Sequence, residues 1–137
     1  MKNDLLLCEF HDSRVETLRF DFPDRLVIVF QSFNCFYKTI QNGIADVWIC
    51  RTTLSFSRVA KVDFSLLAAK TYVSDAVFDF KAPDCCDKYN LQLLEGKECI
   101  SMKMVFGSGA TVNVFGGFVR LEINERVCFL EKFDWIG

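Results

Sequence analysis

The only histidine of the chain, His11, is followed directly by Asp12, and this pair is the first place to look for chemistry. A catalytic histidine needs a nucleophile or substrate in reach and a carboxylate that orients its ring. In an extended segment adjacent side chains point to opposite faces, so Asp12 would point away from His11. Asp12 and Ser13 are hydrogen-bonding residues typical of turns. We therefore interpret the pair as the entrance to a strand, or alternatively as part of a binding surface whose histidine titrates near pH 6.5.

Motifs for a serine nucleophile or a bound nucleotide are absent from the sequence. The pattern G-x-S-x-G does not occur, and the similar stretch FGSGA at residues 106–110 fits a hairpin between strands. Neither G-x-G-x-x-G nor a P-loop occurs, and no alternation of strands and helices is present to carry one. The sequence therefore predicts no catalytic residue and no cofactor.

The chain has seven cysteines, an odd number that argues against a disulfide framework and favours reduced thiols. A structural zinc site needs closely spaced ligands, but the only close pair is Cys85 and Cys86, and a single histidine cannot complete the set. We predict no metal site. Four further cysteines lie in or beside apolar runs, where a thiol behaves as a small hydrophobe, and we expect them in the core: Cys35, Cys50, Cys99 and Cys128.

Acidic residues gather in two stretches. The first contains Glu9, Asp12, Glu16, Asp21 and Asp24, and the second contains Asp75, Asp79, Asp84 and Asp87. Such runs are usually solvated faces. They can also form an electronegative patch that steers a basic partner, and we take these residues, with His11, as candidates for partner binding. A pair of carboxylates acting as general acid and base, as in glycosidases, stays open as an alternative.

Composition limits the class of protein that can use these residues. The chain has 137 residues, 51% of them hydrophobic and 25% charged, which suits a single globular domain over residues 1–137. Its net charge is −2 and no basic stripe is present, so direct binding of nucleic acid is disfavoured. The apolar run at residues 5–8 is too short for a signal peptide or a membrane span, so we expect a cytoplasmic protein.

The elements that must position the candidates show a period of two, which is typical of strands. Residues 18–22 alternate between apolar and charged, Pro23 predicts a turn, and residues 26–30 are apolar on both faces, as in a central strand. Asn42 and Gly43 predict a hairpin, and residues 76–82 a further strand. Four later turns are predicted at residues 95–96, 107–109, 116–117 and 124–125.

One segment, at residues 65–73, fits a short helix that Ser65 could cap. The remaining pattern predicts an all-β or β-rich α+β fold, namely an antiparallel sandwich or half-open barrel of about 8–9 strands. The fifteen phenylalanines are expected mainly in its core. If the fold closes as a barrel, they could instead line an apolar cavity.

Three stretches resemble segments of small bacterial toxin-immunity proteins of contact-dependent or secreted toxin systems: FHDSRV at residues 10–15, LSFSRV at residues 54–59 and YNLQLLEGKECISM at residues 89–102. The resemblance implies a non-catalytic cytoplasmic inhibitor, without a cofactor, that binds and neutralises a cognate toxin domain. If that toxin is a basic nuclease, an acidic patch would suit it. The alternative function is a small β-barrel carrier that binds an apolar molecule in a cavity lined by phenylalanine.

Overall fold

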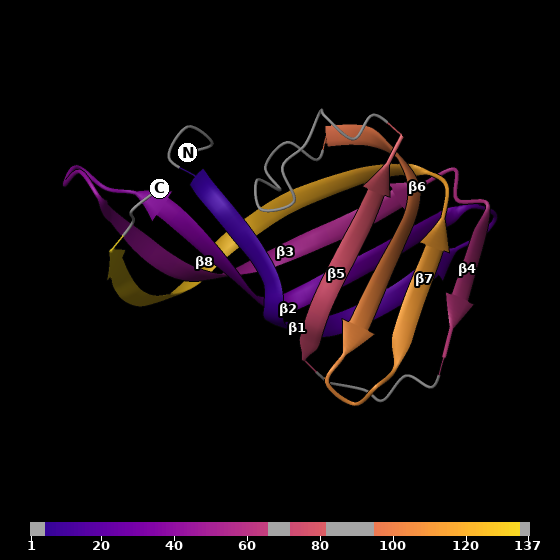
Figure 1. Cartoon of the computed structure of the whole chain (residues 1–137), viewed down its shortest axis with the longest axis horizontal. Coiled ribbons are helices and arrows are strands. Elements are labelled where there is room, and N and C mark those ends of the chain that lie inside the picture. Colours follow the sequence, from indigo (N-terminus) through magenta and orange to yellow (C-terminus); the bar gives the residue numbers. More distant parts are fainter. Residues whose placement is uncertain (1–4, 66–71, 82–94, 135–137) are drawn as a thin grey trace.

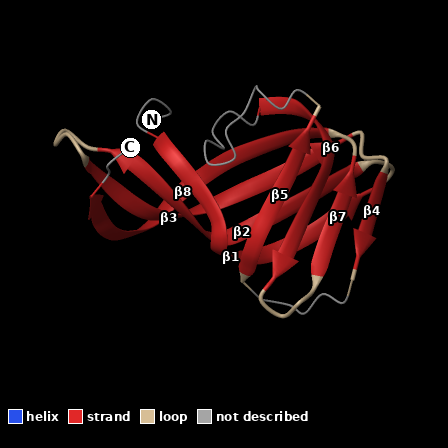
Figure 2. Cartoon of the chain, viewed as in Figure 1, coloured by secondary structure: helices blue, strands red, loops and turns tan. Residues whose placement is uncertain are grey.

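The computed structural model describes residues 5–65, 72–81 and 95–134. Within these ranges the chain forms antiparallel strands joined by turns and contains no helix (Figure 2). The strands are β1 (Leu5–Asp21), β2 (Arg25–Lys38), β3 (Ile44–Ser57), β4 (Lys61–Phe64), β5 (Val73–Phe80), β6 (Glu95–Phe106), β7 (Thr111–Phe115) and β8 (Phe118–Asp134). The predicted all-β, half-open barrel is therefore confirmed.

The sheet has the strand order β1-β2-β3-β8-β6-β7-β4, and β5 also pairs with β6. Figure 1 shows the long strands β1, β2, β3 and β8 crossing behind the shorter β5, β6, β7 and β4. Strand β6 joins the two layers, because Glu95, Lys97 and Glu98 pair with the start of β8 and the following part of β6 pairs with β7. The sheet thus folds over on itself to form a half-barrel.

The line between β1 and β5, which we call the seam, is where the half-barrel meets its own edge. Among the described residues, one isolated bridge, between Arg14 and Tyr72, links the two sides by strand pairing. The Arg14 guanidinium also donates a hydrogen bond to the Tyr72 hydroxyl and lies 4.5 Å from the centre of its ring. Contacts between side chains therefore contribute much of what holds β1 and β5 together at the seam.

Phenylalanine rings fill the space between the layers. The Phe10 ring centre lies 5.8 Å from that of Phe30 and 5.1 Å from that of Phe33, and the centres of Phe30 and Phe33 are 5.3 Å apart. Phe30, Phe33 and Phe56 are fully buried. Burial of each such side chain contributes roughly 1.5–3 kcal/mol. The expectation that most of the fifteen rings lie in the core is confirmed only in part, because seven are buried and six are exposed, namely Phe20, Phe22, Phe64, Phe115, Phe129 and Phe133.

The prediction of a central strand at residues 26–30 is also confirmed. Leu26, Ile28 and Phe30 face the interior, and Val27 on the opposite face is only 5% exposed. Strand β2 has β1 on one side and β3 on the other, so its backbone is paired on both edges. Residues that are apolar on both faces suit this position.

Turn predictions were correct at Pro23, at residues 42–43, at residues 107–109 and at residues 116–117. They were wrong at residues 95–96 and 124–125, because these residues lie inside β6 and β8. Gly96 has φ +70° at a register shift between Glu95 and Lys97. Asn124 falls at another shift, where β8 has an extra residue relative to β3. Both positions are bulges that bend a continuous strand.

The helix predicted at residues 65–73 falls mainly on residues 66–71, which lie outside the described residues. At its C-terminal end the prediction is wrong, because Val73 begins β5. The Ser65 hydroxyl accepts a 2.7 Å hydrogen bond from the Thr111 amide, beside the β4–β7 pair. The described residues include no helix long and apolar enough to span a membrane.

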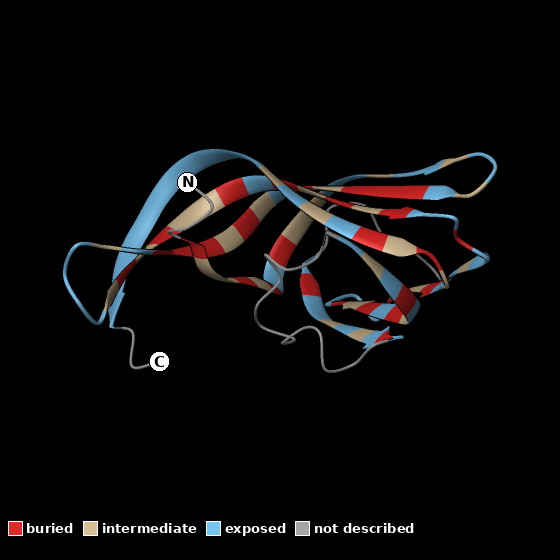
Figure 3. Ribbon diagram, turned by 90° about the horizontal axis from the view of Figure 1, so that it is seen from above, coloured by how far each residue is buried: buried red, intermediate tan, exposed pale blue. Residues whose placement is uncertain are grey.

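We divide the half-barrel into a body and an arm. The body consists of β4–β7 with residues 10–21 of β1, 26–33 of β2, 51–57 of β3 and 118–123 of β8. The arm consists of residues 5–9 of β1, 34–38 of β2, 44–50 of β3 and 124–134 of β8. The arm projects beyond the crossing of the two layers (Figure 1). In the arm, β8 pairs only with β3, and all its residues there are exposed (Figure 3).

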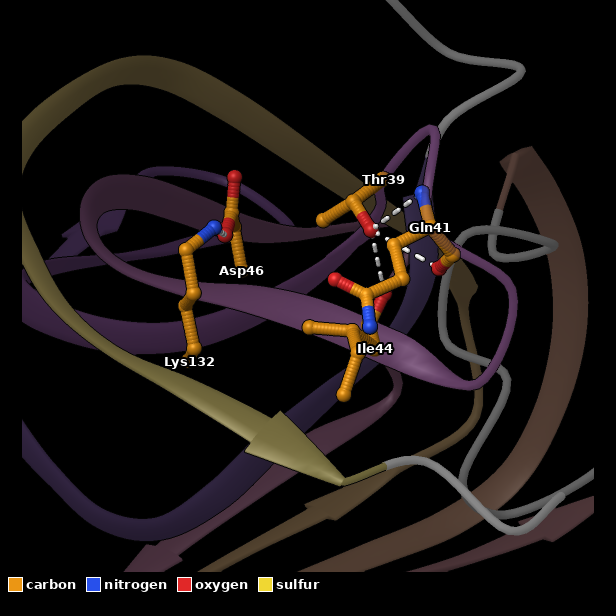
Figure 4. Close-up of polar contacts among 5 residues, drawn as sticks. All are labelled: Thr39, Gln41, Ile44, Asp46 and Lys132. Carbon is orange, nitrogen blue, oxygen red and sulfur yellow. Dashed lines mark hydrogen bonds and ion pairs between the residues drawn. The ribbon is translucent and has the colours of Figure 1, made fainter.

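The tip of the arm is held by polar contacts. The Thr39 hydroxyl donates a 2.8 Å hydrogen bond to the Ile44 carbonyl and accepts one of 3.2 Å from the Gln41 amide (Figure 4). Lys132 Nζ lies 3.0 Å from an Asp46 carboxylate oxygen, which ties β8 to β3. The Thr39 contacts fix the β2–β3 hairpin, and the Lys132–Asp46 pair secures the end of β8 beside it.

Candidate functional site

The candidate site begins with an irregularity in β1. Glu9 is opposite Asn34 of β2 and Arg14 is opposite Ser32, so the intervening residues 10–13 of β1 face a much shorter stretch of β2. Asp12 has φ 64°, a left-handed conformation that Asp and Asn tolerate better than most residues. The bulge directs Phe10 and Ser13 into the core and leaves His11 and Asp12 exposed.

This arrangement corrects the interpretation of the His11–Asp12 pair. The pair lies inside β1 rather than at its entrance, and the bulge turns the two side chains toward each other. His11 Nε2 and Asp12 Oδ2 are 3.5 Å apart. The alternation of a regular strand would have separated them, but the left-handed residue breaks that alternation.

His11 connects the two sides of the seam. Its Nδ1 atom lies 2.8 Å from the carbonyl oxygen of Ser74, the second residue of β5. A ring nitrogen next to a carbonyl must donate, so Nδ1 carries a proton and Nε2 is the nitrogen that titrates. The hydrogen bond to Ser74, followed by the negative charge of Asp12, raises the pKa of His11 above its usual value of 6.5, and Glu9 and Asp75 act in the same direction.

The seam therefore joins parts of the two acidic stretches. We define the seam cluster as Glu9, His11, Asp12, Ser74 and Asp75. Asp75 accepts a hydrogen bond from the Ala76 amide, and neither Glu9 nor Asp75 forms an ion pair with a Lys or Arg among the described residues. Three carboxylates and one histidine thus share an exposed region of the surface.

Other candidates from the sequence lie elsewhere or are neutralised. Glu16 Oε1 is 2.8 Å from Arg51 Nη2, and Asp21 Oδ1 is 2.7 Å from Arg19 Nε. Asp24 lies in the β1–β2 turn, and its carbonyl oxygen accepts a 2.8 Å hydrogen bond from the Val59 amide. Asp84 and Asp87 lie outside the described residues.

Strand β5 extends the acidic surface away from the seam. Asp75, Val77 and Asp79 alternate along β5 and are all exposed, and Val77 is 58% exposed. The Tyr72 side chain, 51% exposed, lies at the start of this row. Sequence reasoning missed Tyr72, Arg14 and Ser74 as site residues. The missing signal was the pairing of β1 with β5, which joins residues 58 to 63 positions apart.

The seam cluster brings negatively charged groups and one histidine together at the surface. Within the described ranges, no serine or cysteine side chain is hydrogen-bonded to His11, because Ser74 contributes its carbonyl oxygen. No group of three or more His, Cys, Asp or Glu residues in those ranges is arranged to hold a metal ion. What the cluster offers a partner is negative charge beside exposed apolar side chains.

The thiols form a separate group inside the half-barrel. Cys8 and Cys35 are directly opposite each other on β1 and β2, with their sulfur atoms 3.7 Å apart. The Tyr37 hydroxyl is 3.9 Å from the Cys50 sulfur, and burial raises the pKa of Tyr37. Cys35, Cys50 and Cys99 are buried as expected, but the same expectation is wrong for Cys128, which lies exposed in the arm. Cys85 and Cys86 lie outside the described residues.

Comparison with known proteins finds no family model, no curated protein and no solved structure that matches this chain.

Proposed function

We propose that this protein is a non-catalytic inhibitor of the immunity type, which acts in the cytoplasm and binds a cognate toxin domain through the seam cluster. The observation that carries the proposal is the meeting of Glu9, Asp12 and Asp75 around His11, from strands far apart in sequence. A surface of this kind attracts a basic partner, such as a nuclease whose substrate cleft is positive. The resemblance to toxin-immunity proteins supports the same assignment.

The neighbours of the seam cluster suit a protein partner. Tight interfaces combine charged groups at the rim with aromatic or apolar anchors near the centre. Tyr72 and Val77 are exposed beside the carboxylates, and Arg14 holds Tyr72 in place across the seam. A basic segment lying along β5 would meet Asp75 and Asp79 with Val77 between them.

The packing of the interior favours a rigid binding scaffold over the carrier alternative. The Phe56 and Phe78 ring centres are 6.5 Å apart and those of Phe78 and Phe80 are 5.4 Å apart, so these rings contact one another. Rings in mutual contact restrict one another's movement, and a rigid scaffold lowers the entropic cost of binding at its surface.

The test is affinity capture of the tagged protein from a lysate of its own organism, with bound proteins identified by mass spectrometry. We expect one stoichiometric basic partner that is lost at high salt, because long-range attraction is screened. The variant Glu9→Gln/Asp12→Asn/Asp75→Asn removes three charges from the seam cluster. It should weaken binding of that partner about 10- to 100-fold, mainly through slower association.

The matched control is Glu122→Gln/Glu125→Gln/Glu131→Gln, which removes three exposed charges from β8. The control variant has the same net charge as the seam variant, so an effect of net charge alone would weaken partner binding equally in the two variants. Retention of full affinity by the seam variant, or equal loss in both variants, would contradict the assignment of the seam cluster.

A further inference from the structure

A second surface feature lies on the outer face of the sheet, away from the seam cluster. It is a hollow of about 530 Å³ formed where β2, β3, β8 and β6 run side by side, and it is lined by Arg25, Ser55, Ser57, Gly96, Phe118 and Arg120. Volumes of several hundred cubic ångströms are typical of sites for small molecules. We call this feature the arginine hollow.

The sheet register explains why these side chains share one place. Ser55 is opposite Arg120 and Ser57 is opposite Phe118, which places both pairs on the outer face of β3 and β8. Leu54, Phe56 and Val119 alternate with them and face the core. Arg25 lies at the start of β2, one strand from Ser57 on the other side. Because neighbouring strands are about 4.8 Å apart, the two long arginine side chains can reach one ligand.

The two arginines of the hollow form no ion pair in the part of the chain that the structure describes, although Glu95 of β6 is opposite Arg120 in the sheet register. Asp21 is opposite Arg25 in the β1–β2 register, but its carboxylate is engaged by Arg19 at 2.7 Å. Two guanidinium groups facing an open concavity without a carboxylate partner are suited to an anion.

The remaining lining residues add hydroxyl groups, an aromatic face and space. Ser55 and Ser57 make no side-chain hydrogen bond with the described residues. Phe118 is partly exposed, and the Arg58 guanidinium lies 5.9 Å from its ring centre, which adds a third positive charge at the margin. A Cβ atom at Gly96 would meet nothing within 4 Å, so the absence of a side chain there keeps the hollow open.

We infer that the arginine hollow binds a small phosphate monoester that carries a planar apolar group. Two guanidinium groups and two hydroxyl groups offer more donors than the two oxygens of a carboxylate accept well, whereas a phosphate monoester presents three terminal oxygens. The Phe118 face offers the planar group a stacking surface. This binding is independent of the proposed inhibition at the seam.

The experiment titrates phenyl phosphate, inorganic phosphate, benzoate and phenol into the isotopically labelled full chain, with backbone amide signals followed by NMR. We expect saturable shifts at residues of the hollow, with phenyl phosphate binding most tightly, inorganic phosphate next, and benzoate and phenol more weakly. Absence of shifts at the hollow, or binding of benzoate as tightly as phenyl phosphate, would overturn the assignment. So would tighter binding of a single-stranded oligonucleotide, whose internal phosphates are diesters.

Variants locate the binding. Arg25→Gln and Arg120→Gln should each weaken phenyl phosphate binding about 10-fold or more, since each removes charge-assisted hydrogen bonds. Arg51→Gln is the matched control, because it removes one arginine charge from the surface at a position paired with Glu16. Gly96→Asn fills the hollow with a residue that tolerates a left-handed backbone and should also weaken binding. Equal affinity of wild type, Arg25→Gln and Arg120→Gln would overturn the inference.

Discussion

The body and the arm share β1, β2, β3 and β8, yet along β8 the same kind of sequence is buried in the body and exposed in the arm. In the body, β8 alternates Val119 toward the core and Arg120 toward solvent. In the arm, the equally apolar residues Val127, Phe129 and Phe133 are 57%, 45% and 45% exposed. Alternation therefore indicates a strand, but burial of the β8 side chains requires a second layer, which covers the body part of β8 and not its arm part. Ala45 and Val47, which are buried in the arm, lie on β3 between β2 and β8.

The largest expected effect is the loss of stability when one phenylalanine ring is removed from each region. Phe30→Ala should lower the free energy of unfolding by about 3–5 kcal/mol, because it leaves a cavity beside Phe10 and Phe33. Phe133→Ala in the arm should cost about 1 kcal/mol, since that ring is half-exposed and contacts Phe36 edge-on at 5.5 Å. Urea unfolding followed by circular dichroism measures both values. Similar losses in the free energy of unfolding for the two variants would contradict the claim that the ring in the body contributes more stability than the ring in the arm.

Thiol reactivity should separate the exposed part of β8 in the arm from the core, with an effect that is easily measured. Burial raises the pKa of Cys99 to about 11, so about one in a thousand of its thiols is ionised at pH 8. Cys128 in the arm is exposed. Iodoacetamide should therefore modify Cys128 at least about 100-fold faster than Cys99, as measured by peptide mass spectrometry over time. Cys128→Ser serves as the control that identifies the fast site.

The seam of the body should depend on pH in a way that the arm does not. Because the folded-state pKa of His11 is raised, the positive charge of its ring contributes stability that is fully present below about pH 6.5 and is lost as pH rises through the raised pKa. NMR titration of the His11 ring should give a pKa above 6.5 that falls in Asp12→Asn. A wild-type pKa at or below 6.5 would contradict the contacts described at the seam.

The smallest effect is expected for the ion pair that links β8 to β3 in the arm. Lys132→Ala should change the free energy of unfolding by less than about 1 kcal/mol, because the lysine is exposed and the pair is screened by water. The double-mutant cycle with Asp46→Ala isolates the pair. A coupling well above that value would show that the arm relies on charge where the body relies on burial.

Much of the fold could be predicted from the sequence because its local signals are strong. The period of two, the hairpin at Asn42 and Gly43, and the doubly apolar β2 each report on a few adjacent residues. The errors at Gly96 and Asn124 have one cause. A bulge and a turn both favour residues that adopt unusual backbone angles, and only the neighbouring strand decides whether the chain reverses.

The candidate site was predictable only in part, because its chemistry depends on contacts between distant segments. Acidic residues at Glu9, Asp12 and Asp75 were recognisable as charge, but their convergence depends on the closure of β5 against β1. The orientation of Asp12 toward His11 depends on a single left-handed residue. The arginine hollow gave no sequence signal, since Arg25 and Arg120 are far apart in the chain and meet through the register of the sheet.

The position of β8 between β3 and β6 also determines the order in which the molecule can be assembled. Both neighbours precede β8 in the chain, and one of the contacts that secures it joins Thr53 to Asn124 across 71 residues. During synthesis the edges of β3 and β6 that later pair with β8 therefore emerge without a partner. The chain between β3 and β8, which includes β4–β7, must bring these strands together before their pairing is complete. Exposed edges of this kind associate readily with other chains. The nascent protein thus depends on rapid arrival of β8, and slow translation after residue 106 would favour aggregation over folding.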